Sequence, residues 1–237
     1  MKSRKQSVLY AQITEKSRIK QKARVSATYI KMTIPLQEAI VDEAMPATLT
    51  FYVDSRFTAA HVKAIKRMLA GTIFSWVEYF DELDGGNTPR FKNCMRKYAK
   101  FNLSPVWFEE KIANGGASLE VMMDGLTTAL AANGFGKAAK AYIMYGTGNF
   151  NVKAVNASDP ERNSLTVTVN PRFLEKTLTD GIRAGALWHA WMHRLGYRHP
   201  AGKYTNYAIG EACMCIMRHH QNKLSTEKDS KYTQYMD

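Results

Sequence analysis

The segment from His189 to His199 constrains this chain more than any other, because it spaces three histidines around a glycine. His189 and His193 are four residues apart, so on a helix with 3.6 residues per turn they project from the same face. Gly196 allows a sharp turn, since glycine adopts positive φ at little cost. That turn can bring His199 back toward the first two imidazoles. Three neutral imidazoles with an open fourth position are the ligand set of a catalytic zinc ion.

The spacing H-x-x-x-H-x-x-G-x-x-H resembles the metzincin zinc-peptidase signature H-E-x-x-H-x-x-G-x-x-H. The chain departs from it at one position, where Ala190 takes the place of the general-base glutamate. Metzincins also have a methionine-bearing turn beneath the metal. Residues 215–219, C-I-M-R-H, resemble that Met-turn, and Met217 follows His199 by eighteen residues. The resemblance implies a zinc endopeptidase that hydrolyses a protein or peptide substrate, with the three histidines as metal ligands.

Further roles follow from the resemblance alone. Gly196 and Met217 would support the metal site, and His219 stands where related enzymes place a tyrosine that reaches the metal or the reaction intermediate. His219 is therefore a candidate extra ligand or oxyanion donor, although it is equally compatible with a partly exposed structural role. Tyr204 and Tyr207, between the third ligand and the Met-turn, are candidates for the wall of a substrate pocket, or for simple packing.

The alanine at position 190 removes one part of the chemistry. In such a site the glutamate takes a proton from the metal-bound water and passes it to the leaving amine. Ala190 cannot do so, and hydrolysis should fall by about 10²–10⁴-fold while the metal still binds. Two explanations stay open. The alanine is an engineered replacement of glutamate, or the chain is a natural zinc-binding pseudopeptidase that serves as a peptide-binding or protein-binding module. We prefer the first, because every other part of the signature is present.

Length and composition are compatible with one substantial domain. The chain has 237 residues, of which 45% are hydrophobic, enough to bury a core. No run of 18 apolar residues is present, so the sequence predicts no transmembrane segment. The basic N-terminus lacks the apolar region of a signal peptide. The three cysteines, Cys94, Cys213 and Cys215, form no disulfide-scaffold pattern. The missing signal-peptide region and the cysteine pattern together predict a cytoplasmic location.

The charge is concentrated at the N-terminus. The formal net charge is +12, and residues 1–35 contain nine Lys and Arg against the single acid Glu15. Such a basic arm can attract an anionic partner, namely nucleic acid, an anionic membrane surface or an acidic protein. It can equally be a solvated helix. Cys213 and Cys215 could bind a metal as thiolates, or be small buried residues before the Met-turn.

Local patterns place the elements along the chain. β-Branched and aromatic residues predict a strand over 48–53, and Thr58 can cap a long helix with one apolar stripe. A second helix begins at Ser118 and ends at Asn133-Gly134. Further expected elements are strands over 141–145 and 165–169, the zinc helix from Thr179 or Asp180 to Leu195, a last helix over 225–236, and a helix over 15–31.

The expected fold class is α+β, with a metzincin-like domain over residues 46–237 and a basic N-terminal extension over residues 1–45. By resemblance, the domain has a twisted mixed sheet with a backing helix and the active-site helix. A small C-terminal subdomain then carries the Met-turn and the final helix. A strand before the zinc helix should form the rim that binds extended substrate, and residues 164–169 or 141–145 are the candidates.

Overall fold

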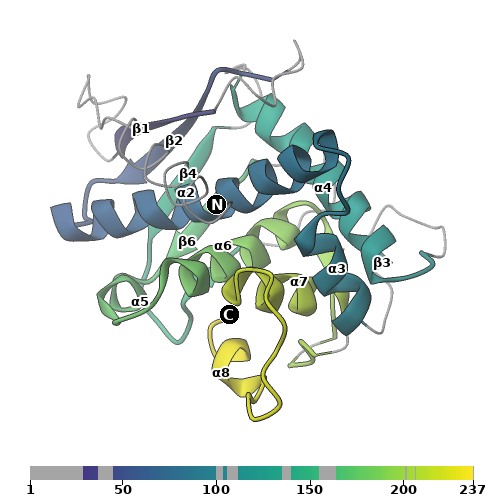
Figure 1. The fold of residues 1–237 in the computed structure, drawn as a ribbon. Coiled ribbons are helices and arrows are strands. Elements are labelled where there is room, and N and C mark those ends of the chain that lie inside the picture. The colour runs from purple at the N-terminus through teal and green to yellow at the C-terminus, as the bar shows by residue number, and fades with distance from the viewer. Residues whose placement is uncertain are drawn as a thin grey trace, which may run out of the picture.

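A computed structural model describes residues 29–36, 45–99, 104–105, 112–134, 140–154, 164–200, 202–205 and 207–236. In chain order (Figure 1) its elements are β1 (Tyr29–Pro35), β2 (Thr48–Asp54), α2 (Ala59–Asp84), α3 (Arg90–Tyr98), β3 (Ser104–Pro105), α4 (Gly115–Gly134), β4 (Ala141–Tyr145), β5 (Val152–Lys153), β6 (Val167–Val169), α5 (Pro171–Glu175), α6 (Asp180–Arg194), β7 (Tyr197–Arg198), α7 (Ala208–Met217) and α8 (Ser230–Thr233). This mixed arrangement is compatible with the predicted α+β class.

The main sheet has five strands in the order β1-β2-β4-β6-β5. β2, β4 and β6 run parallel to one another, while β1 and β5 pair antiparallel at the two edges. A separate two-stranded sheet joins β3 to β7, with Ser104 opposite Arg198 and Pro105 opposite Tyr197. The small sheet matters for function, because β7 lies between Gly196 and His199 and fixes the backbone that precedes the third histidine.

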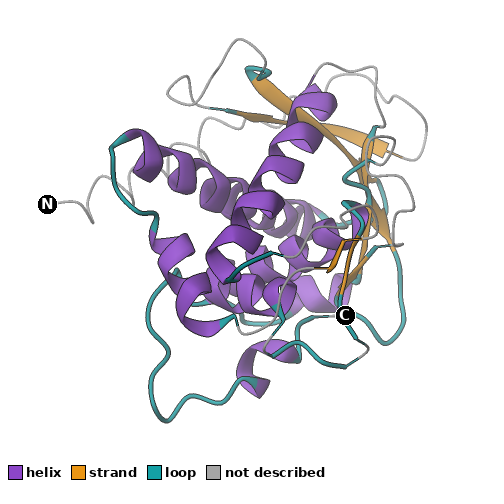
Figure 2. Cartoon of the chain, turned by 90° about the vertical axis from the view of Figure 1, so that its right-hand side faces the viewer, coloured by secondary structure: helices purple, strands orange, loops and turns teal. Residues whose placement is uncertain are grey.

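One face of the main sheet carries the core. Leu49, Phe51 and Val53 of β2 are buried, whereas Thr50 and Tyr52 between them are half-buried. The same alternation recurs on β6, where Val167 and Val169 are buried. Strands with this period have one face packed and one face more open. Figure 2 shows the corresponding layers, with the strands along one side of the molecule and the long helices on the other.

Helix α2 begins at a capping box. The Thr58 side chain accepts from the backbone N–H of His61, and the His61 ring accepts in return from the backbone N–H of Thr58. The apolar stripe expected on this helix is confirmed as a buried face at Val62, Ile65, Leu69, Ile73 and Trp76, whereas Phe80 at its end is half-buried. The Thr72 hydroxyl bonds the carbonyl of Ala184 at 3.1 Å, so α2 backs α6 directly.

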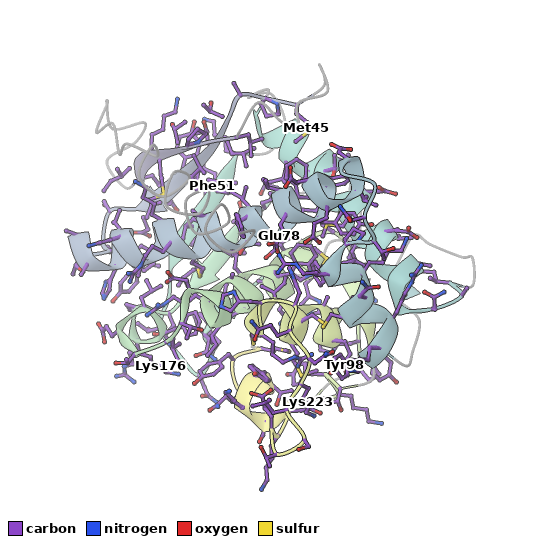
Figure 3. The ribbon with its side chains drawn as sticks, viewed as in Figure 1. Met45, Phe51, Glu78, Tyr98, Lys176 and Lys223 are labelled. Atoms are coloured by element: carbon purple, nitrogen blue, oxygen red, sulfur yellow. A yellow bond between two sulfur atoms is a disulfide. The ribbon has the colours of Figure 1, made fainter. Side chains whose placement is uncertain are left out.

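Helix α6 joins the sheet through Trp191. Its ring stacks on Phe51 of β2, with centroids 6.1 Å apart and planes 7° from parallel, and Figure 3 labels Phe51 in this core. The indole N–H of Trp191 donates to the carbonyl of Leu165 at 3.1 Å. Burying this ring while satisfying its donor anchors the C-terminal half of α6 beside the segment that enters β6.

Several predicted elements are confirmed and others need correction. The strands over 48–53 and 141–145 and the helix beginning after Thr179 are present as expected. The second helix begins earlier than Ser118, because the Asn114 side chain accepts from the backbone N–H groups of Gly116 and Ala117 and so caps α4. The last helix is the single turn α8 instead of a helix over 225–236.

The N-terminal extension was interpreted incorrectly where the structure describes it. The predicted helix over 15–31 is wrong at its end, because Tyr29–Pro35 is strand β1 and pairs with β2 along seven residues. Met32 and Ile34 of this strand are buried in the core, and they reach it because the strand pairs with β2. The expected boundary near residue 45 thus falls between two hydrogen-bonded strands. Residues 1–28, with most of the basic arm, lie outside the described part.

Neither candidate rim strand lies at an edge. β4 lies between β2 and β6, and β6 lies between β4 and β5. Much of their backbone is therefore already paired with neighbouring strands, which leaves little of it to hold an extended substrate by main-chain bonds. The edge strand on this side of the sheet is the short β5. None of the described helices combines the length and the apolar character needed to cross a bilayer.

Candidate metal centre

Helix α6 presents the first two histidines from a buried position. Its start is capped by Thr179, whose hydroxyl accepts from the backbone N–H of Ile182 at 3.3 Å, and Asp180 complements the positive end of the helix dipole. The helix ends at Arg194, and Gly196 then has φ 89°, as the turn after the second histidine was predicted to require. His189 has no exposed surface, so its polar ring lies inside a largely apolar helix surface.

Backbone carbonyls orient two of the three rings. His193 Nδ1 lies 3.0 Å from the carbonyl oxygen of Tyr197, and His199 Nδ1 lies 2.9 Å from that of Pro200. A carbonyl oxygen only accepts, so the Nδ1 atoms carry the protons and the Nε2 lone pairs are available as ligands. Carbonyl partners on the second ring nitrogen are typical of metal-binding histidines.

The Nε2 atoms converge on one point. His189 Nε2 lies 2.9 Å from His199 Nε2 and 3.2 Å from His193 Nε2, and one ligand atom from each of the three rings lies within 4.8 Å of the others. Nitrogens bound tetrahedrally to zinc at ~2.0–2.1 Å are about 3.3 Å apart. The lone pairs of His193 and His199 both face His189 Nε2, an arrangement that needs a proton or a cation among them.

Burial and the neighbouring histidines keep His189 unprotonated. Burial, and then the neighbouring His193 and His199, lower the pKa of His189 well below 6.5. The first cause is desolvation, which penalises the charged ring, and the second is repulsion between imidazolium groups. His189 therefore stays neutral at pH 7, which is the form that coordinates a metal.

Tyr204 lies against the histidine cluster. Its ring centroid is 5.0 Å from that of His199 and 5.7 Å from that of His189. Of the two tyrosines predicted to line a substrate pocket, Tyr204 is thus adjacent to the metal centre. Tyr207 is the half-buried N-cap residue of α7, and its role in a pocket stays a prediction. Glu211, the nearest downstream carboxylate, is buried in the first turn of α7.

Position 190 is part of the core. Ala190 lies directly after His189 on α6 and is only 1% exposed. Its methyl group offers neither a proton acceptor nor a metal ligand. Its location beside the first histidine agrees with the expected place of the general base, and its chemistry leaves that role unfilled.

Met217 packs against α6, but it does so from the end of a helix instead of from the expected Met-turn. It is the last residue of helix α7, so Cys215 and Ile216 are helical and the expected Met-turn is a helix end. Its side chain packs against Gly185, where an added Cβ would lie 2.5 Å from Met217 Cγ. Gly185 precedes His189 by one helical turn, so Met217 contacts the helix on the side and near the level of the metal centre.

The proposed role of His219 at the metal is wrong. Its imidazole lies beside Gly181, where an added Cβ would be 3.0 Å from the ring. Gly181 is eight residues before His189, about 12 Å along the helix. The cause is local backbone geometry, because His219 and His220 both adopt positive φ, 53° and 60°, and turn the chain away after α7. His220 instead contacts Glu78 at 3.1 Å and stacks on Phe91.

The cysteines also differ from expectation. Cys94 of α3 and Cys215 of α7 form a disulfide, with Cα atoms 6.1 Å apart, so Cys215 is not a thiolate ligand. Cys213 is buried and lies outside the disulfide. Disulfides are typical of oxidising compartments, which counts against the predicted cytoplasmic location. No local sequence signal reveals a pairing across 121 residues.

Comparisons with models of protein families, with curated proteins and with solved structures find no match for this chain. The inference about function therefore rests on the histidine cluster, on the residues around it and on the signature that they resemble.

Proposed function

We propose that the chain belongs to the metzincin type of zinc endopeptidase and that, with alanine at position 190, it binds zinc without efficient hydrolysis. The observation that carries the proposal is the convergence of three Nε2 atoms, two of them oriented by backbone carbonyls. A cation at that point replaces the repulsion between lone pairs with coordination bonds. Three histidines with no fourth protein ligand in the described cluster fit a catalytic site better than a closed structural one.

When bound, zinc would acidify a water molecule and polarise the carbonyl of a peptide. The chain's own groups have separate tasks. His189, His193 and His199 hold the metal as neutral ligands, and the carbonyls of Tyr197 and Pro200 keep His193 and His199 in the required tautomer. Tyr204, adjacent to two ligands, is the described phenol best placed to donate a hydrogen bond to a substrate oxygen. A carboxylate at position 190 would supply the proton transfer that Ala190 cannot.

The decisive experiment restores that carboxylate. Ala190→Glu, Ala190→Gln and the present chain are each loaded with zinc and incubated with a diverse peptide mixture, and cleavage is measured by mass spectrometry. We expect chelator-sensitive cleavage by the glutamate variant, at least about 10²-fold above the other two. The glutamine variant matches its size without its basicity. Absence of cleavage by a folded, zinc-loaded glutamate variant would contradict the peptidase proposal.

One observation favours a second candidate, a natural zinc-binding pseudopeptidase that binds peptides. Ala190 is 1% exposed within the hydrophobic core, and burying a carboxylate without partners is costly. Thermal and urea unfolding of Ala190→Glu distinguish the two. A loss above about 3 kcal/mol indicates a core built for a methyl group, whereas a small loss indicates space kept for glutamate.

A further inference from the structure

A second site lies beside the disulfide, on the side of α3 and α7. A cavity of about 580 Å³ is lined by residues from α3 and from the segment after α7. This volume is within the range of small-molecule sites. Its wall includes Cys94, the cations Arg90 and Lys97, and the amides of Asn93, Gln221 and Asn222. No carboxylate is among its described lining residues, so the wall offers positive charge and neutral hydrogen-bonding groups.

The positive charge in this cavity comes chiefly from Lys97. Arg90 is paired with Glu78 and Glu82 behind the wall, and Figure 3 labels Glu78 on α2. Lys97 is exposed, and its ammonium group contacts only a neutral acceptor, Asn222 Oδ1, at 2.9 Å among the described hydrogen bonds. A small anion entering the cavity therefore meets a cation that forms no ion pair with a carboxylate in the described part of the chain.

Behind Cys94 lies a buried cation. Arg218 is only 7% exposed, and no described carboxylate lies within ion-pair distance of it. Its guanidinium lies 5.0 Å from the ring of Tyr98 and 5.5 Å from that of Tyr232, and Figure 3 labels Tyr98. Its Nε and Nη1 atoms are buried without a hydrogen-bond partner. Two aromatic faces offset only part of the desolvation of a permanent charge.

This cation touches both halves of the disulfide. Arg218 Nη2 lies 3.7 Å from Cys94 Sγ and 3.7 Å from Cys215 Sγ. Glu227 interacts with Arg218 only at longer electrostatic range. A thiolate at Cys215 would place an anion in direct contact with the guanidinium, and a neighbouring cation stabilises a thiolate. A sulfur that leaves easily as a thiolate speeds exchange at its partner sulfur. Cys94 lines the cavity and keeps 5% of its surface exposed, whereas Cys215 has no exposed surface, so Cys94 is the sulfur that a thiolate in the cavity can reach.

We propose that the Cys94–Cys215 disulfide is a modification site for an anionic low-molecular-weight thiol. The thiolate enters the cavity and attacks Cys94 Sγ, forming a new S–S bond to that sulfur. The bond to Cys215 breaks, and Cys215 leaves with the electron pair as a thiolate beside Arg218. The step is an exchange without net oxidation, because one disulfide and one thiolate are consumed and one of each is formed. Attack by Cys215 on the mixed disulfide reverses it.

The test compares two thiols that share the same cysteinyl sulfur and differ in charge, with rates expressed per thiolate present. The folded full chain is incubated with reduced glutathione or with its diethyl ester, in which both carboxylates are masked. Intact mass gives the rate of adduct formation, and peptide mapping locates the adduct. We expect modification at Cys94, about tenfold faster with glutathione at low salt. Lys97→Glu should remove or reverse this preference, whereas Lys97→Arg should keep it.

The leaving group is tested separately. Arg218→Lys keeps the charge and Arg218→Gln removes it, so the glutamine variant should exchange about tenfold or more slowly. If the glutamine variant does not fold, the comparison of the two thiols and the Lys97 variants still test the proposed exchange at Cys94. Modification at Cys213, equal rates for both thiols at low salt, or no adduct without denaturant would each overturn the proposal.

Discussion

No side chain fits at position 210 while Tyr204 keeps its place, because a Cβ on Gly210 would lie 1.8 Å from the carbonyl oxygen of Tyr204. The contact is with backbone, so no rotamer change relieves it. Gly210 is in the first turn of α7, and it allows the chain that carries Tyr204 to lie directly on that helix. The glycine thereby helps to position a ring that contacts two of the three histidines.

Gly210→Ala should destabilise the protein by about 3 kcal/mol. At an unobstructed helical site the same change stabilises by about 1 kcal/mol, so the sign itself reports the clash. Gly86→Ala is the control, since Gly86 has φ 70° but open space around an added Cβ, and it should lose only about 1 kcal/mol. Urea unfolding measures both, and equal losses would contradict the assigned contact.

The three ligands and the excluded histidine give a matched pair of variants. His193→Ala should lower zinc affinity by at least about 10²-fold, because only two ligands remain. His219→Ala should leave affinity unchanged, since its ring lies beside Gly181. Elemental analysis after dialysis against a competing chelator measures both. Full zinc retention by His193→Ala would contradict the assignment of the metal centre. Zinc loss by His219→Ala would show that His219 is a ligand after all.

Acid should weaken the metal-free protein. The pKa of His189 is lowered well below 6.5 by burial and by its two histidine neighbours, so the unfolded chain takes up a proton on this ring near pH 6.5 while the folded chain does not. Stability present above pH 6.5 is then lost as the pH falls, with a slope of about 1.4 kcal/mol per pH unit for this group.

Urea unfolding with a chelator at pH 5 to 7.5 measures that slope. His189→Gln provides the control, because glutamine is polar and does not titrate in this range. The unfolding free energy of this variant should change less with pH than that of the unchanged chain, by about 1.4 kcal/mol per pH unit, which corresponds to the uptake of one proton. Identical slopes would show that His189 takes up a proton as readily in the folded chain as in the unfolded one.

Breaking the disulfide should reduce stability substantially. The bond closes a loop of 121 residues, for which the chain-entropy account predicts about 4–5 kcal/mol. Cys94→Ala tests this in thermal unfolding. Cys213→Ala is the comparison, because it removes a buried sulfur of the same size and leaves the bridge in place. Equal losses from the two variants would indicate that only packing at the sulfurs matters.

The parts predicted from sequence are those specified by neighbouring residues. Helix α6 follows from its cap at Thr179, its two histidines share a face because of their four-residue spacing, and the turn follows from Gly196. All of these signals lie within twenty residues or so, and each has a direct physical meaning on a helix. The sequence therefore predicted which three rings meet, although it could not identify the carbonyls that orient them.

The parts that sequence did not predict depend on contacts between distant segments. The position of the His219 ring depends on how α7 ends. Two consecutive histidines give no local sign that both adopt positive φ, as His219 and His220 do. Strand β1 was missed because it follows a basic segment, so its apolar residues Met32 and Ile34 gave no clear local sign of a buried strand. Their place in the core becomes evident only from the pairing with β2. Tertiary context decided these cases against local pattern.

Strand β1 also determines how this protein can be shortened. A chain begun at residue 46 would lose a partner that pairs with β2 along seven residues. The N–H and C=O groups on that side of β2 would become an open sheet edge, beside the buried Leu49, Phe51 and Val53. Open, apolar edges recruit strands from other molecules, so such a fragment would aggregate even though its three histidines are retained.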